Sequence, residues 1–327
     1  MATLKSLVDE TTNIKDELVE CHNNLKNNLI EKGVECSDAD KMPSLIDKVK
    51  NISNVPPYIK QVVGKINGIP SSSASKFGNA VCVEDKIYRF YKNSLCIYDC
   101  VNDTYELETL DLDISESQVQ EYFDGNIYIT GAKKLFIYNI ETKTITNGTN
   151  TYSFYRYMRS TMIGENIYIV GGYTTSPSGN SMSSANRIYN CLTDTWTIGT
   201  SYPTTIAYHT INNYNNFIYV FGGHNRDLST KTCRKYDIES KIWTAISNRP
   251  AGSHEISGFK YKDKQYIFGG YDTGSKDVSI YNYIEDTWDT GTGVPGLVTS
   301  PICVPYKNCG FMFSSSSSTE QIRYIIL

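Results

Sequence analysis

Residues 218–243 read IYVFGGHNRDLSTKTCRKYDIESKIW, and this stretch decides the fold. An Ile-Tyr pair opens an apolar run that ends in a double glycine, Tyr236 follows, and Trp243 stands seven residues after Tyr236. Short runs rich in β-branched and aromatic residues, bounded by Gly, Asn and Asp, are typical of strands separated by tight turns. The stretch therefore predicts a small unit of short consecutive strands.

The same pattern recurs along most of the chain. It begins with an Ile-Tyr pair or an equivalent, at Ile87-Tyr88, Ile127-Tyr128, Ile167-Tyr168, Ile218-Tyr219 and Gln265-Tyr266. A second tyrosine follows, at Tyr98, Tyr138, Tyr189, Tyr236 and Tyr281, with a sixth at Tyr324. Seven residues after the first five of these stand Tyr105, Ile145, Trp196, Trp243 and Trp288. A repeat of about 40 to 50 residues with four short strands per unit predicts the blades of a β-propeller.

These copies resemble the kelch repeat family. IYVFGG at 218–223 followed by KYDIESKIW at 235–243 is close to the consensus of that repeat, and the copies at 167–196 and 266–288 are similar. The first two copies depart from it, because RFYKN and ITGAK replace the double glycine and neither copy has the tryptophan. The resemblance covers residues 58–327 and implies a fold more strongly than it implies a function.

Counting the copies predicts an all-β fold, a six-bladed kelch-type β-propeller over residues 55–327, behind a small α-helical, coiled-coil-like segment. Tyr324 lies three residues before the end of the sequence, so the last unit needs a fourth strand from elsewhere. Val63 precedes Pro70 by seven residues, the offset that separates each tryptophan from a proline in the full repeats. Because ring closure removes exposed sheet edges, we expect residues 58–69 to close the last blade.

Residues 1–54 form a separate segment in this interpretation. Apolar residues at alternating spacings of three and four predict one amphipathic helix over about residues 3–32. The seam consists of Leu4, Leu7, Thr11, Ile14, Leu18, Cys21, Leu25 and Asn28. Polar residues on such a seam are typical of helices that fix a register and an oligomer number. We expect a homo-oligomer, a trimer ahead of a dimer, and the alternative is a helix that only packs on the propeller.

Composition argues against several classes of partner. The chain has 31 Lys and Arg against 35 Asp and Glu, a net charge of -4, which does not favour nucleic acid. No apolar run approaches the roughly 20 residues of a membrane span, and MATLKSLVDE lacks the apolar core of a signal peptide. The nine cysteines are odd in number and form no CxxC pair, so we expect reduced thiols.

Candidate catalytic groups do not assemble into a recognisable motif. The four histidines include no HxH or HExxH pattern, which argues against a metal site. Asp and Glu concentrate in short turns, whereas glycoside hydrolysis needs two carboxylates that face one pocket. We therefore expect no metal, no cofactor and no enzymatic activity.

The residues that remain for function lie on loops. The loops between second and third strands share one rim with the connections between units, and they are long at 173–186, 224–232 and 271–277. Long loops on a rigid scaffold commonly carry binding residues, and aromatic rings beside Asn, Asp and Arg suit a sugar. The candidate binding residues are Tyr173, His224, Asn225, Arg226, Tyr271 and Asp272, beside Tyr202, Tyr208, His209 and His254 on the connections. The alternative is that they are merely solvated loop residues.

The helical segment, LKSLVDETTNIKDELVECHNNLKNNLIEKGVECSDADKMPSLIDKVKNI, resembles the opening of tail, baseplate and fibre proteins from phages and prophages of Gram-positive bacteria. In that setting a short helical module attaches a variable distal domain to the particle. The resemblance implies a virion protein made in the bacterial cytoplasm, with other virion proteins as partners of the helices. The propeller would then bind a host cell-surface glycan or protein. The alternatives are a purely structural virion component without a receptor and an enzyme that degrades envelope polysaccharide.

Overall fold

The computed structural model describes residues 4–31, 35–37, 39–50, 58–62, 79–102, 104–114, 119–130, 134–149, 156–176, 179–226, 228–270, 277–291, 293, 301–307, 309–313 and 321–325. The chain divides into two compact units. The smaller unit is Met1–Tyr58 with Ile326–Leu327, and the larger unit is Ile59–Ile325.

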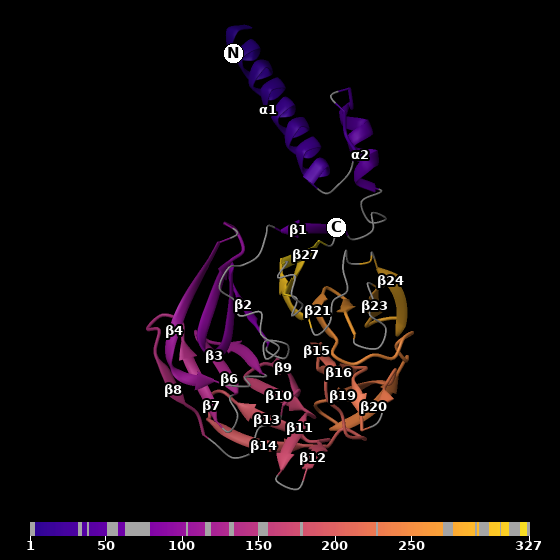
Figure 1. The fold of residues 1–327 in the computed structure, drawn as a ribbon. Coiled ribbons are helices and arrows are strands. Elements are labelled where there is room, and N and C mark those ends of the chain that lie inside the picture. Colours follow the sequence, from indigo (N-terminus) through magenta and orange to yellow (C-terminus); the bar gives the residue numbers. More distant parts are fainter. Residues whose placement is uncertain are drawn as a thin grey trace. The chain divides into compact units, whose positions relative to one another are not determined.

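Five four-stranded sheets, each ordered from an inner to an outer strand, make up most of the larger unit (Figure 1). They are β5, β6, β7 and β8 (Gln120–Phe123, Asn126–Thr130, Leu135–Asn139, Ile145–Asn147); β9, β10, β13 and β14 (Arg159–Ile163, Asn166–Val170, Asn186–Asn190, Thr195–Gly199); β15, β16, β19 and β20 (Thr210–Tyr214, Phe217–Phe221, Cys233–Asp237, Ile242–Ile246); β21, β22, β23 and β24 (Ser257–Tyr261, Lys264–Phe268, Val278–Asn282, Thr287–Gly291); and β25, β26, β27 and β1 (Ile302–Tyr306, Cys309–Phe313, Gln321–Ile325, Tyr58–Val62).

The prediction of a six-bladed propeller is wrong. The described residues form five four-stranded blades, and the first repeat forms a three-stranded sheet of β2 (Val81–Val83), β3 (Lys86–Asp99) and β4 (Thr104–Ile114). The 14-residue β3 occupies the place of two strands, because it pairs with β2 through its first residues and with β4 from Lys92 onward. The physical reason is local: RFYKN contains no double glycine to end one strand and start a loop.

The outer strand of the last blade comes from the other end of the chain. β1 lies beside β27, at the place where the sequence predicts a closing segment from residues 58–69. Tyr58–Val62 form this strand, whereas residues 63–69, with Val63, lie outside the described residues.

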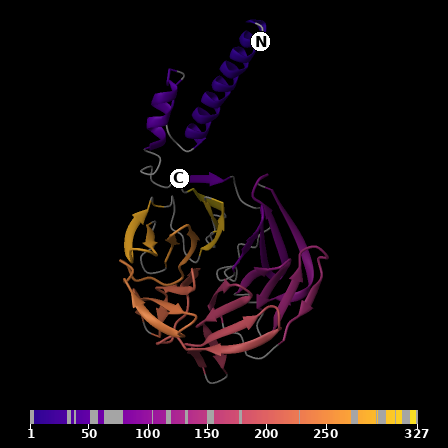
Figure 2. The same cartoon turned by 180° about the vertical axis from the view of Figure 1, so that it is seen from behind.

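The inner strands stand side by side around a central axis (Figures 1 and 2). They follow one another in the order β2, β5, β9, β15, β21 and β25, and β25 lies next to β2. Two short hairpins project beyond the second strands, β11 with β12 (Tyr173–Ser176, Gly179–Met182) and β17 with β18 (His224–Asn225, Leu228–Ser229).

The core lies between successive sheets, and the Ile-Tyr pairs explain how it is built. Adjacent residues of a strand point to opposite faces of the sheet. Ile167 packs in the cluster that contains Tyr128 of the preceding blade, while Tyr168 packs in the cluster that contains Ile218 of the following blade. Tyr219 continues the series by packing with Ile267. Each pair therefore joins its blade to both neighbours.

The constant spacing of seven residues between tyrosine and tryptophan reflects the register in which the third and fourth strands of these blades pair. Tyr189 lies directly opposite Trp196, and the other two tryptophans pair in the same way. Each indole Nε1 donates a hydrogen bond to a backbone carbonyl of the preceding blade, from Trp196 to Thr149 (2.7 Å), from Trp243 to Thr200 (2.9 Å) and from Trp288 to Ser247 (2.9 Å).

The smaller unit contains α1 (Leu4–Glu31) and α2 (Met42–Lys50), which contact each other. Among the side chains of this hairpin that the structure describes, Leu29 and Leu45 are fully buried. On the predicted seam, Leu18, Cys21 and Asn28 are exposed and Leu25 is half-buried. The side chains of Leu4, Leu7, Thr11 and Ile14 lie outside the described part of the structure. Among the residues described, neither helix combines the length and apolar character that crossing a membrane requires.

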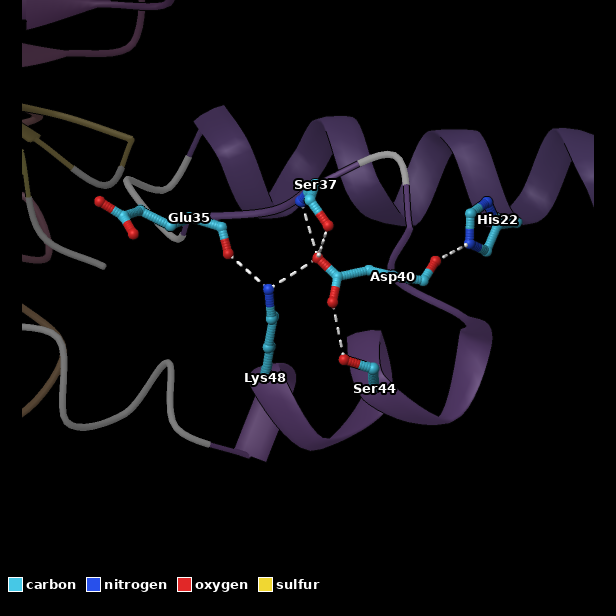
Figure 3. A network of polar contacts seen from close by, with 6 residues as sticks. All are labelled: His22, Glu35, Ser37, Asp40, Ser44 and Lys48. Atoms are coloured by element: carbon cyan, nitrogen blue, oxygen red, sulfur yellow. Dashed lines mark hydrogen bonds and ion pairs between the residues drawn. The ribbon is translucent and has the colours of Figure 1, made fainter.

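Asp40 holds the two helices together (Figure 3). Its carboxylate accepts hydrogen bonds from the Ser37 N–H (2.7 Å), the Ser44 hydroxyl (2.8 Å) and the Lys48 ammonium (2.8 Å), and its carbonyl accepts one from His22 Nε2 (2.8 Å). The hydrogen bond from Lys48, followed by those from Ser37 and Ser44, holds the pKa of Asp40 well below its usual value.

Candidate ligand-binding site

The glycine pairs position one rim of the propeller. Gly171, Gly172, Gly222 and Gly223 all have positive φ angles, which glycine adopts without steric strain. The Gly172 N–H donates to the Ile206 carbonyl of the next blade (2.8 Å), and a Cβ at Gly171 would lie 2.1 Å from that same oxygen. The glycine pair is therefore required for the loop after the second strand to approach the next blade.

Three residues that precede inner strands on this rim have a left-handed backbone although they are not glycine. They are Tyr157 (φ 61°), Tyr208 (φ 56°) and Glu255 (φ 58°). Each stands two residues before the inner strand of its blade, at Arg159, Thr210 and Ser257. Bulky residues rarely adopt this conformation, and where they do they cluster at functional sites. Three consecutive blades thus present an unusual side chain at the same place.

These positions assemble a group of aromatic rings that we call the tyrosine face: Tyr157, Tyr173, Tyr208, His224 and His254. The rings of Tyr157 and Tyr208 stack with their centroids 4.1 Å apart, and Tyr173 stands edge-on to both at 5.8 Å. His254 lies 5.8 Å from Tyr208 and 5.0 Å from His224. All five residues are half-buried.

Backbone and side-chain hydrogen bonds fix the tyrosine face. The Tyr208 N–H donates to the Tyr157 carbonyl (3.1 Å), and the backbone of Tyr173 exchanges two hydrogen bonds with that of Arg156. The Ser229 hydroxyl lies 2.6 Å from His254 Nδ1. Burial raises the pKa of Tyr173 and that of Tyr208, so both phenols stay protonated at neutral pH. The face therefore offers rigid rings with neutral phenolic groups.

A cavity of about 220 Å³ opens along the central axis beside this rim, and all the inner strands contribute to its lining. Among the described residues, the charged ones in its lining are Arg159 on β9 and Glu121 on β5. The Ser160 hydroxyl donates a hydrogen bond to the Glu121 carboxylate, and burial raises the pKa of Glu121 to about 7. Arg159 is 6% exposed, and its guanidinium donates to the Met158 carbonyl (3.2 Å).

His209 lies between Tyr208 on the rim and Thr210 in the cavity lining, and it is fully buried. Neither ring nitrogen has a hydrogen-bond partner among the described residues. Burial, helped by the positive charge of Arg159, lowers the pKa of His209 to about 3, so its ring is neutral at physiological pH.

The structure brings only some of the six predicted binding residues together. Tyr173 and His224 lie in the tyrosine face. The Asn225 side chain is hydrogen-bonded to the Thr205 hydroxyl (3.2 Å), and Arg226 is exposed with its N–H directed at Met182 Sδ (3.0 Å). Tyr271 and Asp272 lie outside the described residues.

Tyr157, Arg159, Glu121 and Glu255 are not among the binding residues predicted from the sequence. A signal for Tyr157 was present, because it stands two residues before its inner strand just as Tyr208 does. Alignment of the copies on their inner strands would have brought Tyr157, Tyr208 and Glu255 to one position. Arg159 carries no such signal, since only the closed ring shows that its side chain meets groups from other blades.

Comparison with known proteins supports the repeat assignment. The family description "Kelch motif" matches residues 156–203, and a second description of the same name matches residues 206–250. This chain contains kelch repeats. They form the all-β propeller described above.

Similar curated proteins include human Kelch-like protein 23, 25% identical over 221 residues that cover 65% of this chain and 38% of that protein. Alpha-scruin of Limulus polyphemus is 30% identical over 117 residues, 33% of this chain and 13% of that protein. The chain thus spans well under half the length of these relatives. Among solved structures, that of YjhT superimposes with a TM-score of 0.64 at 11% identity, over 75% of this chain and 93% of that one, which shows a shared fold.

Proposed function

We propose that the propeller is a non-enzymatic recognition domain whose tyrosine face binds a glycan at the surface of a bacterial cell. The observation that carries this proposal is the rigid group of Tyr157, Tyr173 and Tyr208 beside His224 and His254. Tyrosine rings supply contact area at a low cost in conformational entropy, and their faces complement the C–H face of a sugar ring. Histidine and phenol groups at the edges can pair with the hydroxyls.

The described cavity lining supports binding more than hydrolysis. A glycosidase places two carboxyl groups on either side of the bond that it cleaves. Glu121 is the single carboxylate among the described lining residues of the cavity. Glu255, on the rim, stands two residues before the inner strand of a different blade and is not part of this lining.

We further propose that residues 1–54 attach the propeller to a phage particle through other virion proteins and bring copies of the chain together. The support for this setting is the resemblance of the helical segment to phage tail, baseplate and fibre modules. The exposure of Leu18 and Cys21 on the predicted seam is consistent with a second copy packing there.

A glycan array tests the proposal. The wild-type full-length protein should bind a defined subset of bacterial glycans, and the variant Tyr157→Ala with Tyr208→Ala should lose that binding. The change removes the stacked rings, which typically supply most of the binding energy at such surfaces. Failure of the wild type to bind any glycan would instead favour a structural component without a receptor.

A further inference from the structure

Arg159 is a buried cation at the upper end of the central cavity. It begins β9, it is 6% exposed, and it lines the cavity two residues after Tyr157 of the tyrosine face. Arginine is rarely buried to this extent without a partner. Its position therefore requires an explanation that the blade fold itself does not supply.

The Arg159 guanidinium lies within electrostatic range of groups from other blades. Its electrostatic neighbours are Tyr208, Glu255 and Cys303, which come from three other blades. Within the described residues its hydrogen bond goes to the carbonyl of Met158, its own neighbour in the chain, and no carboxylate lies within ion-pair distance. Burial lowers the pKa of Arg159 to about 10, so the group remains positively charged at neutral pH.

Two other cations of the propeller, half-buried Lys260 and buried Arg249, donate hydrogen bonds to neighbouring blade residues, although Nη1 of Arg249 has no partner among the described residues. Lys260 on β21 donates to the carbonyl and the side-chain oxygen of Asn213 (2.8 and 3.0 Å), and Arg249 donates to the Ser279 hydroxyl (3.2 Å). A guanidinium has five N–H donors in a planar fork that matches a carboxylate or a phosphate. Arg159 differs because it lines the central cavity, whereas Lys260 and Arg249 are not among the residues of its lining.

We propose that Arg159 binds the anionic group, a carboxylate or a phosphate, of an acidic sugar whose ring lies on the tyrosine face. This inference rests on the proposed glycan binding and specifies the class of glycan. The sequence separation supports it, because Tyr157, which belongs to the tyrosine face, and Arg159, which lines the cavity, stand only two residues apart in the chain. Charge-assisted, forked hydrogen bonds are stronger and more directional than neutral ones.

Glu255 allows a second test of the same site, because it carries a negative charge near Arg159. Its carboxylate is an electrostatic neighbour of Arg159, and it occupies the left-handed position equivalent to Tyr157 and Tyr208. A bound anion would compete with this carboxylate for Arg159. Glu255→Gln should therefore tighten the binding of an acidic sugar.

The test compares glucuronate, glucose 6-phosphate and glucose by thermal shift and by titration calorimetry at constant ionic strength with the full-length protein. The three probes share one ring, and the first two distinguish a carboxylate from a phosphate. We expect at least one acidic probe to raise the melting temperature and to bind about tenfold or more tightly than glucose. Arg159→Met should lower the affinity for that acidic probe to the affinity for glucose. Arg159→Lys should keep part of the preference for the acidic probe, because lysine has a positive charge but lacks the forked donors of arginine.

Arg249→Met is the matched control, because it removes an equally buried arginine that does not line the cavity. It should leave the preference for the acidic probe unchanged. An Arg159→Met protein that still prefers the acidic probe, or a wild type that responds to none of the three, overturns the inference. If glucose binds as well as the acidic probes and Tyr157→Ala with Tyr208→Ala abolishes it, the inference fails while the proposed glycan binding stands.

Discussion

At the scale of single residues, an Asp-Thr-Trp turn binds the backbone N–H and carbonyl of one residue in the preceding blade. The Asp286 carboxylate accepts a hydrogen bond from the Ser247 N–H (2.8 Å), and the Trp288 indole donates to the Ser247 carbonyl (2.9 Å). Asp194 and Trp196 hold Thr149 in the same way (2.7 Å each). A short turn motif thus fixes how two sheets pack.

The blade between these two has the tryptophan hydrogen bond but lacks the aspartate that accepts from the backbone N–H. Introducing that aspartate should stabilise the propeller. Lys241 stands where the other blades have Asp, with φ 60° against 51° for Asp194. Lys241→Asp should place an acceptor near the Thr200 N–H and should fit the left-handed backbone better. We expect a gain of about 1 kcal/mol, seen as a melting temperature about 2–4 °C higher.

Lys241→Asn is the control, because it relieves the backbone without adding a carboxylate. Its gain should be smaller than that of Lys241→Asp. Equal gains would show that the backbone, and not the carboxylate, is responsible.

Glu121 makes the stability of the propeller depend on pH. Burial raises the pKa of Glu121 from 4.5 to about 7, so the folded state favours the neutral acid. Below pH 4.5 the group is protonated in both states. As the pH rises from 4.5 to about 7 the unfolded state ionises while the folded state stays neutral, so stability falls over this window, and the penalty is constant above it. Glu121→Gln should therefore gain stability relative to wild type between pH 5 and pH 8, by up to about 3 kcal/mol. Denaturant unfolding at both pH values measures this difference, and a difference independent of pH would contradict the assignment.

At the scale of elements, β1 determines whether the last blade is complete. Tyr58–Val62 supply the strand beside β27. A chain that begins at residue 55 keeps this strand, and a chain that begins at residue 63 lacks it. The shorter chain should melt at least about 6 °C lower, because an exposed edge and a lost strand together remove a few kcal/mol. Equal melting temperatures would show that β1 is dispensable.

The exposed seam of α1 predicts self-association. Leu18 is 60% exposed and lies on the seam, whereas its neighbour Val19 is 51% exposed and lies off it. Leu18→Lys should dissociate the oligomer, because a charge would enter the contact between helices, and Val19→Lys should not. Sedimentation equilibrium measures both. A wild-type protein that is monomeric would refute the oligomer.

How far the sequence predicts the structure differs among these elements. The seven-residue spacing predicts a register, and Tyr189 does face Trp196. The six-bladed prediction fails at the first repeat, because the pattern in RFYKN cannot reveal that residues 86–99 run as one strand. Arg159 could not be predicted as a site residue, since its neighbours come from blades far apart in the sequence.

At the scale of the whole molecule, ring closure brings the tyrosine face and the central cavity to one rim. Tyr157 and Tyr208 belong to successive blades, yet their rings stack at 4.1 Å because the connections that precede β9 and β15 lie side by side. Tyr122 and Tyr261, by contrast, lie toward the other ends of their inner strands. Substitutions at Tyr122 and Tyr261 can therefore serve as controls for substitutions in the tyrosine face.

The most direct test of glycan recognition measures equilibrium binding of the labelled full-length protein to cell walls isolated from a panel of Gram-positive bacteria. Wild type should bind at least one of these walls. On that wall, Tyr157→Ala with Tyr208→Ala should bind about tenfold or more weakly, and Tyr122→Ala with Tyr261→Ala should bind as wild type does. Undiminished binding by the Tyr157 and Tyr208 double variant, or no wall binding by wild type, would contradict the proposed role of the tyrosine face.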